Sequence, residues 1–310
     1  MYISMIDRYG REVLSLRLAV TQRCNQSCIY CHNEGQVPSR KEMSAGEIEK
    51  VIRAAASIGV KKVKITGGEP LLKEDIVQIV AVCSEHLNEV SLTTNGVMLA
   101  DLALPLREAG LARLNISLDA LDELVYEKIT GRNDLPKVLK GMDAASEAGF
   151  QSSKFNTVVL KGLNDGELED LVVFSAEKSA TLQLIELTSR KEDIGSPFYQ
   201  TYHYDLSGFE GALASWASGT GVNEIHNRMR YSFRVNGSTA VVEVVRSMGN
   251  KDFCANCRRI RVTSDGRIKP CLLTNSGEVD TLHLLRAGED EETLKELFAK
   301  AISHRRPYWD

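Results

Sequence analysis

The feature that most constrains the fold is an alternation of short β-branched runs with longer amphipathic segments over the first two thirds of the chain. The runs that read as strands are residues 13–20, 61–66, 89–94, 113–119, 154–160 and 181–187. Helices of this length between strands imply right-handed crossovers and a parallel sheet. The clearest helix follows Ser44, which forms a predicted capping box with Glu47, and Gly59 provides its left-handed end. Six such units predict an α/β fold, a partial (β/α)6 barrel of the TIM type.

The alternation stops near residue 190. Residues 231–245 and 258–272 read as hairpins, the second turning at Asp265-Gly266, and residues 288–303 read as a closing helix. We therefore expect a barrel over residues 1–190 and a C-terminal α+β extension over residues 191–310 that lies over the open side of the barrel.

Composition narrows the classes of protein to which the chain can belong. Of its 310 residues 43% are hydrophobic and 26% charged, which is ordinary for a globular protein and excludes a disordered class. A net charge of -4 gives no global reason to expect nucleic acid or an anionic membrane as partner. The charged N-terminal segment and the lack of an apolar run of about 18 residues predict a cytoplasmic protein.

Six of the seven cysteines fall into two clusters, and Cys83 stands alone in a helical pattern, where it reads as a small buried residue. The clusters are Cys24, Cys28 and Cys31, and Cys254, Cys257 and Cys271. An odd count, short spacings and no secretory signal argue against a disulfide framework. The two clusters therefore predict reduced thiolates that hold metal.

The first cluster directly follows the first predicted strand, at the barrel end where active sites collect. Three thiolates in one loop can bind three irons of a 4Fe-4S cubane and leave the fourth iron open. Zinc is the alternative, but a structural zinc site closes with a fourth ligand. His32 adjoins Cys31 and would be strained in reaching the same ion.

The spacing Cys-x3-Cys-x2-Cys after the first strand, with Tyr30 before the third cysteine, resembles the radical S-adenosylmethionine (SAM) signature. The segment "TGGEP", residues 66–70, is similar to the glycine motif of that family, and its glycines lack the Cβ that would keep a ligand from the backbone. The resemblance implies that SAM chelates the open iron and is cleaved reductively. It implies SAM contacts at Tyr30, Gly68 and Ser117.

The second cluster has the spacing Cys254-x2-Cys257-x13-Cys271. A zinc ribbon would carry a fourth ligand two residues after Cys271, where this chain has Leu273. Together with "DRYGREVLSLRLAVTQRC" near the N-terminus, the paired clusters resemble the GTP 3′,8-cyclase family, which starts molybdenum-cofactor biosynthesis. The resemblance implies a second 4Fe-4S cluster whose open iron holds the guanine of GTP.

The same resemblance implies cations for the triphosphate and a specific reaction. The GTP residues it names are Arg17, Lys64, Thr93, Lys154, Arg259 and Arg261, of which Arg17, Arg259 and Arg261 would also act in catalysis. The implied reaction removes the ribose 3′ hydrogen and joins C3′ to C8, which gives 3′,8-cyclo-7,8-dihydro-GTP. The implied partners are a one-electron donor and cyclic pyranopterin monophosphate synthase, with a homodimer as the expected assembly.

Three departures from the family pattern leave alternatives open. Thr188 stands where many members have methionine, Lys64 replaces a common arginine, and the chain ends "HRRPYWD" without a double-glycine tail. A radical SAM cyclase that acts on another nucleotide or on a peptide is therefore an alternative. A non-enzymatic iron or zinc regulator is a further one.

The second hairpin allows a geometric prediction. Arg259 and Arg261 are two residues apart and share one face of a strand. We expect a three-residue loop with Gly266 at positive φ, which would set Cys271 opposite Arg261. Both arginines and the second cluster would then line one pocket.

Overall fold

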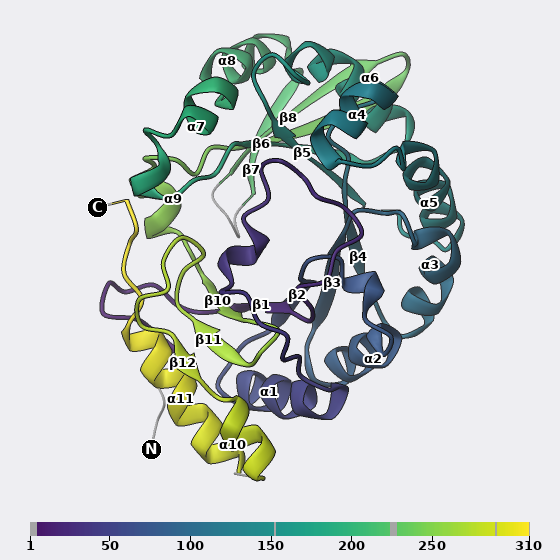
Figure 1. Ribbon diagram of the computed structural model, residues 1–310. Coiled ribbons are helices and arrows are strands. Elements are labelled where there is room, and N and C mark those ends of the chain that lie inside the picture. The colour runs from purple at the N-terminus through teal and green to yellow at the C-terminus, as the bar shows by residue number, and fades with distance from the viewer. Residues whose placement is uncertain (1–4, 152, 224–227, 289, 310) are drawn as a thin grey trace.

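A computed structural model describes residues 5–151, 153–223, 228–288 and 290–309 of the chain. Six parallel strands follow one another in sequence order around a curved sheet, with helices on its outside (Figure 1). The strands are β1 (Ser15–Ala19), β2 (Lys62–Thr66), β3 (Glu89–Thr94), β4 (Arg113–Ser117), β5 (Lys154–Val159) and β6 (Thr181–Glu186). The helices are α1 (Ala45–Ser57), α2 (Ile76–His86), α3 (Leu99–Glu108), α4 (Glu123–Thr130), α5 (Leu135–Glu147) and α6 (Leu168–Glu177). The predicted partial barrel is confirmed.

Local sequence explains where the first helix begins and ends. The Ser44 side chain accepts from the Glu47 amide at 3.3 Å, and the Glu47 carboxylate accepts from the Ser44 amide at 2.8 Å. This reciprocal pair satisfies two amides that the first turn leaves without helical partners. Gly59, at φ +107°, then reverses the chain toward β2. The predicted capping box is confirmed.

The barrel strands bury apolar side chains under the helices and turn polar ones inward. Leu16 and Leu18 on β1 are in the hydrophobic core, whereas Arg17 between them lines the internal cavity. On β2, Lys64 lines the same cavity between the buried Val63 and Ile65. Because successive strand residues face opposite sides, the period of two places a column of polar residues inside the barrel. This column positions the site.

The C-terminal part extends the sheet at both edges. β10 pairs in parallel with β1, and β9 pairs in parallel with β6, so the sheet has the order β12-β11-β10-β1-β2-β3-β4-β5-β6-β9-β8-β7. Its strands are β7 (Gly219–Asn223), β8 (Arg228–Val235), β9 (Ser238–Val245), β10 (Arg259–Val262), β11 (Arg267–Lys269) and β12 (Val279–Asp280). Its helices are α7 (Pro197–Tyr202), α8 (Ser207–Trp216), α9 (Lys251–Ala255), α10 (Leu282–Ala287) and α11 (Glu291–Ser303). The sequence analysis did not predict that the strands of this part would continue the barrel sheet at both edges.

Both predicted hairpins are present, β8–β9 and β10–β11. The closing helix differs from the expected residues 288–303, because Gly288 at φ +82° ends α10 and the Asp290 side chain caps a new helix at the Thr293 amide, 2.9 Å away. α11 packs against α1 (Figure 1). The boundary at residue 190 stays a prediction, since one sheet continues across it.

Two smaller observations complete the fold. Cys83 is fully buried in the core, as predicted. None of the helices in the described part of the chain has the length and apolar character needed to cross a membrane.

Candidate functional site

The first cysteine cluster lies on the loop that leaves β1 and crosses the mouth of the barrel, drawn in purple at the centre of Figure 1. Backbone bonds hold this loop to the end of α4: the Ser27 amide donates to the Thr130 carbonyl at 2.8 Å, and the Ile29 amide donates to the Ile129 carbonyl at 3.0 Å. Its three thiols are free. The loop therefore has a fixed path while its cysteine side chains remain available to a ligand.

The two glycines of "TGGEP" serve the protein's own backbone. A Cβ at Gly67 would lie 2.6 Å from the Thr21 carbonyl oxygen, and a Cβ at Gly68 would lie 2.3 Å from that of Arg23. The Gly68 amide also donates to the Thr21 carbonyl at 2.8 Å. The sequence analysis did not predict this close approach of the cysteine loop to the two glycines. The Gly68 contact with SAM stays a prediction.

Tyr30 is held by an acid that the sequence analysis did not single out. Its hydroxyl donates to Asp119 Oδ2 at 2.5 Å, and Asp119 Oδ1 accepts from the Val158 amide at 2.9 Å. Burial raises the pKa of Asp119 to about 6, although these hydrogen bonds favour its ionised form. Ser117 is two residues earlier, in register with Asn156 of β5. An acid at the carboxyl end of a barrel strand was the available signal.

The donor set of the first cluster fits an iron–sulfur centre. Burial, with the Asp119 carboxylate nearby, raises the pKa of the Cys28 thiol, so its thiolate requires a cationic partner. Within residues 5–151, 153–223, 228–288 and 290–309, no three His, Cys, Asp or Glu side chains converge on one ion. A 4Fe-4S cubane needs no such convergence, because each thiolate binds a separate iron.

The second cluster is carried by α9 and the β10–β11 hairpin. Arg261 pairs with Lys269 and Val262 with Ile268, so residues 264–266 form a three-residue loop, with Gly266 at φ +77°. The predicted loop and its positive φ are confirmed. The predicted position of Cys271 opposite Arg261 was wrong: continuing this register by two places sets Cys271 opposite Arg259. Cys271 itself lies beyond the end of β11, and it lines the same cavity as both arginines.

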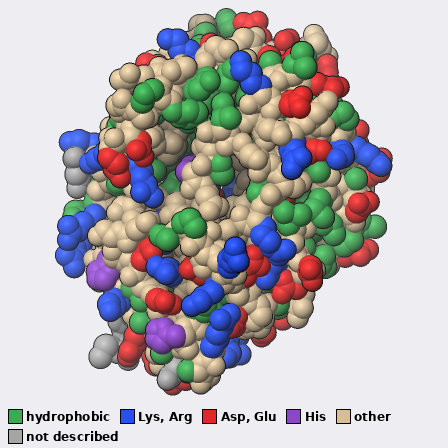
Figure 2. Space-filling view, viewed as in Figure 1, with side chains coloured by type: hydrophobic (Ala, Val, Ile, Leu, Met, Phe, Trp, Pro, Cys, Tyr) green, Lys and Arg blue, Asp and Glu red, His purple; other side chains and the backbone are tan. Residues whose placement is uncertain are grey.

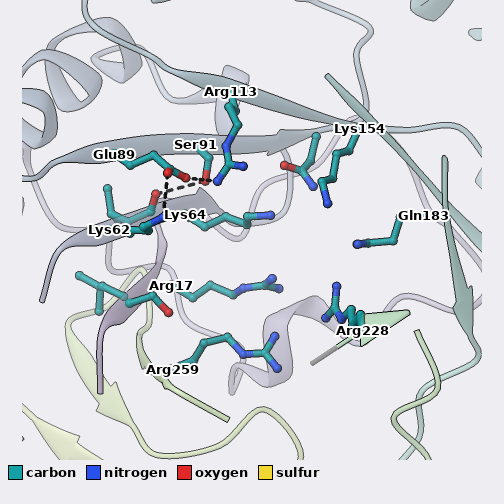
Figure 3. Close-up of a pocket in the computed structure, with 14 residues that line it drawn as sticks. Arg17, Lys62, Lys64, Glu89, Ser91, Arg113, Lys154, Gln183, Arg228 and Arg259 are labelled. Atoms are coloured by element: carbon teal, nitrogen blue, oxygen red, sulfur yellow. Dashed lines mark hydrogen bonds and ion pairs between the residues drawn. The ribbon is translucent and has the colours of Figure 1, made fainter. Parts of the chain in front are cut away.

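One cavity brings together most of the predicted site residues, and the molecular surface is hollowed near the centre of the face in Figure 2. Its lining includes Arg17, Lys64, Thr93, Cys254, Cys257, Arg259, Arg261 and Cys271. A second cavity continues toward the amino ends of the strands and includes Lys154. The two share Arg17, Lys64, Gln183, Arg228 and Arg259 (Figure 3). Both arginines of β10 therefore face the interior, as expected.

The cavity concentrates positive charge. Burial, together with the neighbouring Arg17 and Lys154, lowers the pKa of Lys64 well below its usual range. Among the described residues no ion pair joins Lys64, Arg228 or Arg259 to a carboxylate. The donors Arg17 Nε and Arg228 Nε are buried at this cavity without a hydrogen-bond partner among the described residues. Such a group of unpaired donors and cations suits a polyanionic ligand.

Two acids that the sequence analysis missed hold other cations of the site. Glu34 Oε1 lies 3.2 Å from Arg17 Nη1, and Glu34 Oε2 lies 2.7 Å from Arg261 Nη1. Glu243 on β9 lies 2.6 Å from Lys154 Nζ. No local sequence signal connects these pairs, because each joins elements distant along the chain.

Arg228 is a further residue that the sequence analysis missed. Its guanidinium carbon lies 5.8 Å from the centre of the Phe253 ring, and that of Arg259 lies 5.3 Å from the same centre. Contacts of this kind favour the charged guanidinium over the face of the ring. Phe253 therefore gathers two arginines at the cavity wall.

The overall structure is similar to that of proteins of known structure at low sequence identity. Streptococcus suis SuiB bound to the precursor peptide SuiA has a TM-score of 0.68 at 18% identity, covering 93% of this chain and 67% of that one. The protein anSMEcpe with bound AdoMet has a TM-score of 0.66 at 18% identity, covering 96% and 84%. These similarities concern the fold alone.

Sequence comparisons are more specific. The Radical SAM superfamily domain matches residues 18–174, and the Molybdenum Cofactor Synthesis C domain matches residues 180–310. The chain is 44% identical over 305 residues to the probable GTP 3′,8-cyclase of Pyrococcus horikoshii, covering 98% of each. It is 44% identical over 306 residues to that of Thermococcus kodakarensis, covering 98% of this chain and 99% of the other. The barrel, the paired cysteine clusters and these relatives all indicate the same family. The chain belongs to the GTP 3′,8-cyclase family of radical SAM enzymes.

Proposed function

We propose that this chain converts GTP to 3′,8-cyclo-7,8-dihydro-GTP, the first step of molybdenum-cofactor biosynthesis. Curated relatives named GTP 3′,8-cyclase align with it from end to end. The observation that carries the proposal is the cationic cavity beside Cys254, Cys257 and Cys271. It offers a place for a nucleotide triphosphate next to a second metal centre.

The two cysteine clusters would hold the two 4Fe-4S centres, the first together with SAM. When bound, these groups supply the one-electron chemistry that removes a substrate hydrogen and the open iron that accepts the guanine. The protein's own part is to hold the nucleotide in one orientation and to exclude water. Tyr30, fixed by Asp119, lies on the first cluster's loop at the edge of a cavity that also includes Thr188.

The distribution of cations along the two cavities indicates how the nucleotide would be oriented. The cysteines of the second cluster lie at one end of the joined cavities, and Lys154 lies in the part toward the amino ends of the strands, with Lys62 and Arg113 (Figure 3). We therefore place the guanine near Cys257 and Cys271 and the triphosphate deeper in the barrel. The ribose would then lie between the two clusters.

The cations of the cavity would bind the triphosphate and stabilise its charge. Arg17, Lys64, Thr93, Lys154, Arg259 and Arg261 keep their predicted roles as GTP ligands, and Arg228 joins them. Arg17, Arg259 and Arg261 would also hold the nucleotide during catalysis. A guanidinium binds phosphate oxygens through paired donors, which fixes orientation as well as charge.

The remaining partners follow from the reaction. We expect a one-electron donor, delivery of the product to cyclic pyranopterin monophosphate synthase, and a homodimer as the assembly. A cytoplasmic location also stays a prediction.

A comparison of nucleotides tests the proposal. Anaerobic, reconstituted protein is incubated with SAM, a reductant and each of the four nucleoside triphosphates, and with a peptide mixture. The expected result is 5′-deoxyadenosine with a nucleotide isomer from GTP alone. Turnover of ATP at an equal rate would support action on another nucleotide, and modification of the peptides would support the peptide-directed alternative.

Nucleotide binding tests the role of Arg228. Arg228→Gln should weaken GTP binding by roughly 10-fold or more, because a charge-assisted hydrogen bond contributes about 1.5–3 kcal/mol, and should leave guanosine binding unchanged. Arg234→Gln is the matched control, since Arg234 is exposed on the same strand and its side chain donates to the Gly237 carbonyl in the hairpin turn. Equal GTP affinities for the two variants would remove Arg228 from the site.

A further inference from the structure

We infer that Asp7, Arg11 and Arg305 form a positioning network that fixes the Cys254–Cys257 loop in the shape required by the second cluster. The inference rests on the proposed function, which assigns that cluster to this loop. The three residues come from the N-terminal segment and from the segment after α11, and they meet beneath α9. None of them belongs to a cysteine motif.

The contacts form a closed set around one carboxylate. Asp7 Oδ2 lies 2.8 Å from Arg11 Nε and 3.0 Å from Arg305 Nη1. Arg11 Nη1 then donates to the Cys254 carbonyl at 3.0 Å, and Arg305 Nη2 donates to the Cys257 carbonyl. Arg305 Nη1 also donates to the Arg11 carbonyl at 3.1 Å. One acid thus aims two guanidinium groups at the backbone of two cluster cysteines.

Burial makes this arrangement stiff. The side chains of Asp7, Arg11 and Arg305 are 0%, 7% and 1% exposed. Asp7 Oδ1 also accepts from the amides of Tyr9 and Arg11, at 2.9 and 3.0 Å, which fixes the carboxylate in place. A buried ion that loses its partner lowers the stability of the fold, so removing any one of the three residues should disturb the whole network.

A second observation points from the network to a ligand. Arg11 Nη2 is buried without a hydrogen-bond partner among the described residues, and Arg11 lines the cavity together with Cys254 and Cys257. The unpaired donor is available to a group held by those cysteines. Residues that orient metal ligands in this way commonly change metal affinity about 10- to 100-fold when replaced.

The network also places a net positive charge beside the loop of the second cluster. One carboxylate and two guanidinium groups leave one net positive charge beside the loop. A positive charge favours the reduced, more negative form of a cluster. Loss of Arg305 should therefore lower the reduction potential of the second cluster and leave that of the first unchanged.

The test uses the reconstituted holoprotein and the variants Asp7→Asn, Arg11→Gln, Arg305→Lys and Arg305→Gln. Iron and sulfide are counted, each cluster is followed by electron paramagnetic resonance, and iron loss to a chelator is timed. We expect about 10-fold faster loss from the second cluster or a fall from about eight to about four irons per chain. SAM binding at the first cluster should be unchanged. Arg305→Lys should behave as a partial variant, because one ammonium cannot replace two guanidinium donors.

Arg258→Gln is the matched control, an exposed arginine directly after Cys257 whose side chain lies outside the network. Equal chelation rates and an equal second-cluster potential for all variants would overturn the inference. Should Asp7→Asn fail to fold, the chelation rates and second-cluster potentials of Arg11→Gln and the Arg305 variants decide the inference. Wild-type protein that assembles only one cluster would instead contradict the proposed function.

Discussion

Replacement of Glu34 by glutamine tests the electrostatics of the site. Burial by itself would raise the pKa of the Glu34 carboxyl, but Arg17 and Arg261 more than offset it and lower the pKa from 4.5 to about 2. Each unit of difference corresponds to about 1.36 kcal/mol. The ionised carboxylate therefore contributes on the order of 3 kcal/mol to the free energy of unfolding at neutral pH. Glu34→Gln should lose most of this amount.

The pH dependence has a definite sign. Because the pKa of Glu34 is depressed in the folded protein, its contribution is fully present above the unfolded pKa near 4.5 and is lost as the pH falls toward 2. The stability difference between wild type and Glu34→Gln should be largest at pH 7 and reduced by about half at pH 3. Replacement of a carboxyl with an ordinary pKa should give a stability difference that does not vary with pH in this way.

Denaturant unfolding of the protein without clusters, followed by the fluorescence of its two tryptophans, gives the measurement. Glu74→Gln is the control, because Glu74 is exposed. A destabilisation by Glu34→Gln of less than about 0.5 kcal/mol at pH 7, the range of ordinary surface changes, would refute the reasoning. A difference that does not depend on pH would refute it equally.

Three further replacements test the first cluster and its surroundings. Cys28→Ala should abolish 5′-deoxyadenosine formation while the second cluster persists; normal yields would remove this cysteine from the cluster. Gly68→Ala would put a Cβ 2.3 Å from the Arg23 carbonyl oxygen, so iron at the first cluster should fall; unchanged iron would show that the loop can shift. Asp119→Asn replaces the charged acceptor of the Tyr30 hydroxyl. Its dissociation constant for SAM should rise about 10-fold, as for loss of a charge-assisted hydrogen bond, and an unchanged constant would assign Asp119 to folding alone.

The barrel could be predicted because its information is local. Each strand carries its own β-branched run, and the Ser44 cap marks the first helix without reference to the rest of the chain. The cysteine clusters could also be predicted, since each lies within one short stretch of the chain, residues 24–31 and residues 254–271. Periodicity and spacing are sufficient for features of this kind.

The contacts between distant elements could not be read in the same way. The Lys154–Glu243 pair exists because β9 pairs with β6 in parallel, and Arg228 reaches the cavity because β8 pairs with β9. The Asp7–Arg305 pair requires both end segments to meet under α9. Each of these contacts depends on which elements are neighbours in the fold, and the sequences of the single strands do not determine that.

The β10–β11 hairpin contains one feature that the sequence predicted correctly and one that it did not. Asp265-Gly266 predicted the turn and Gly266 its positive φ, because a left-handed residue favours glycine. The partner of Cys271 was misplaced by two residues although the loop length was correct, because the loop occupies residues 264–266, and moving a loop by one residue along the chain moves every later pair by two.

The most direct test of the proposed reaction follows the substrate hydrogen. Reconstituted protein is given SAM, a reductant and GTP carrying deuterium at C3′, and both products are analysed by mass spectrometry. The proposed geometry, with the ribose between the two clusters, predicts that the deuterium appears in 5′-deoxyadenosine and that the cyclised nucleotide has lost it. Unlabelled 5′-deoxyadenosine, or a nucleotide product that keeps its deuterium, would contradict 3′ hydrogen abstraction in this cavity.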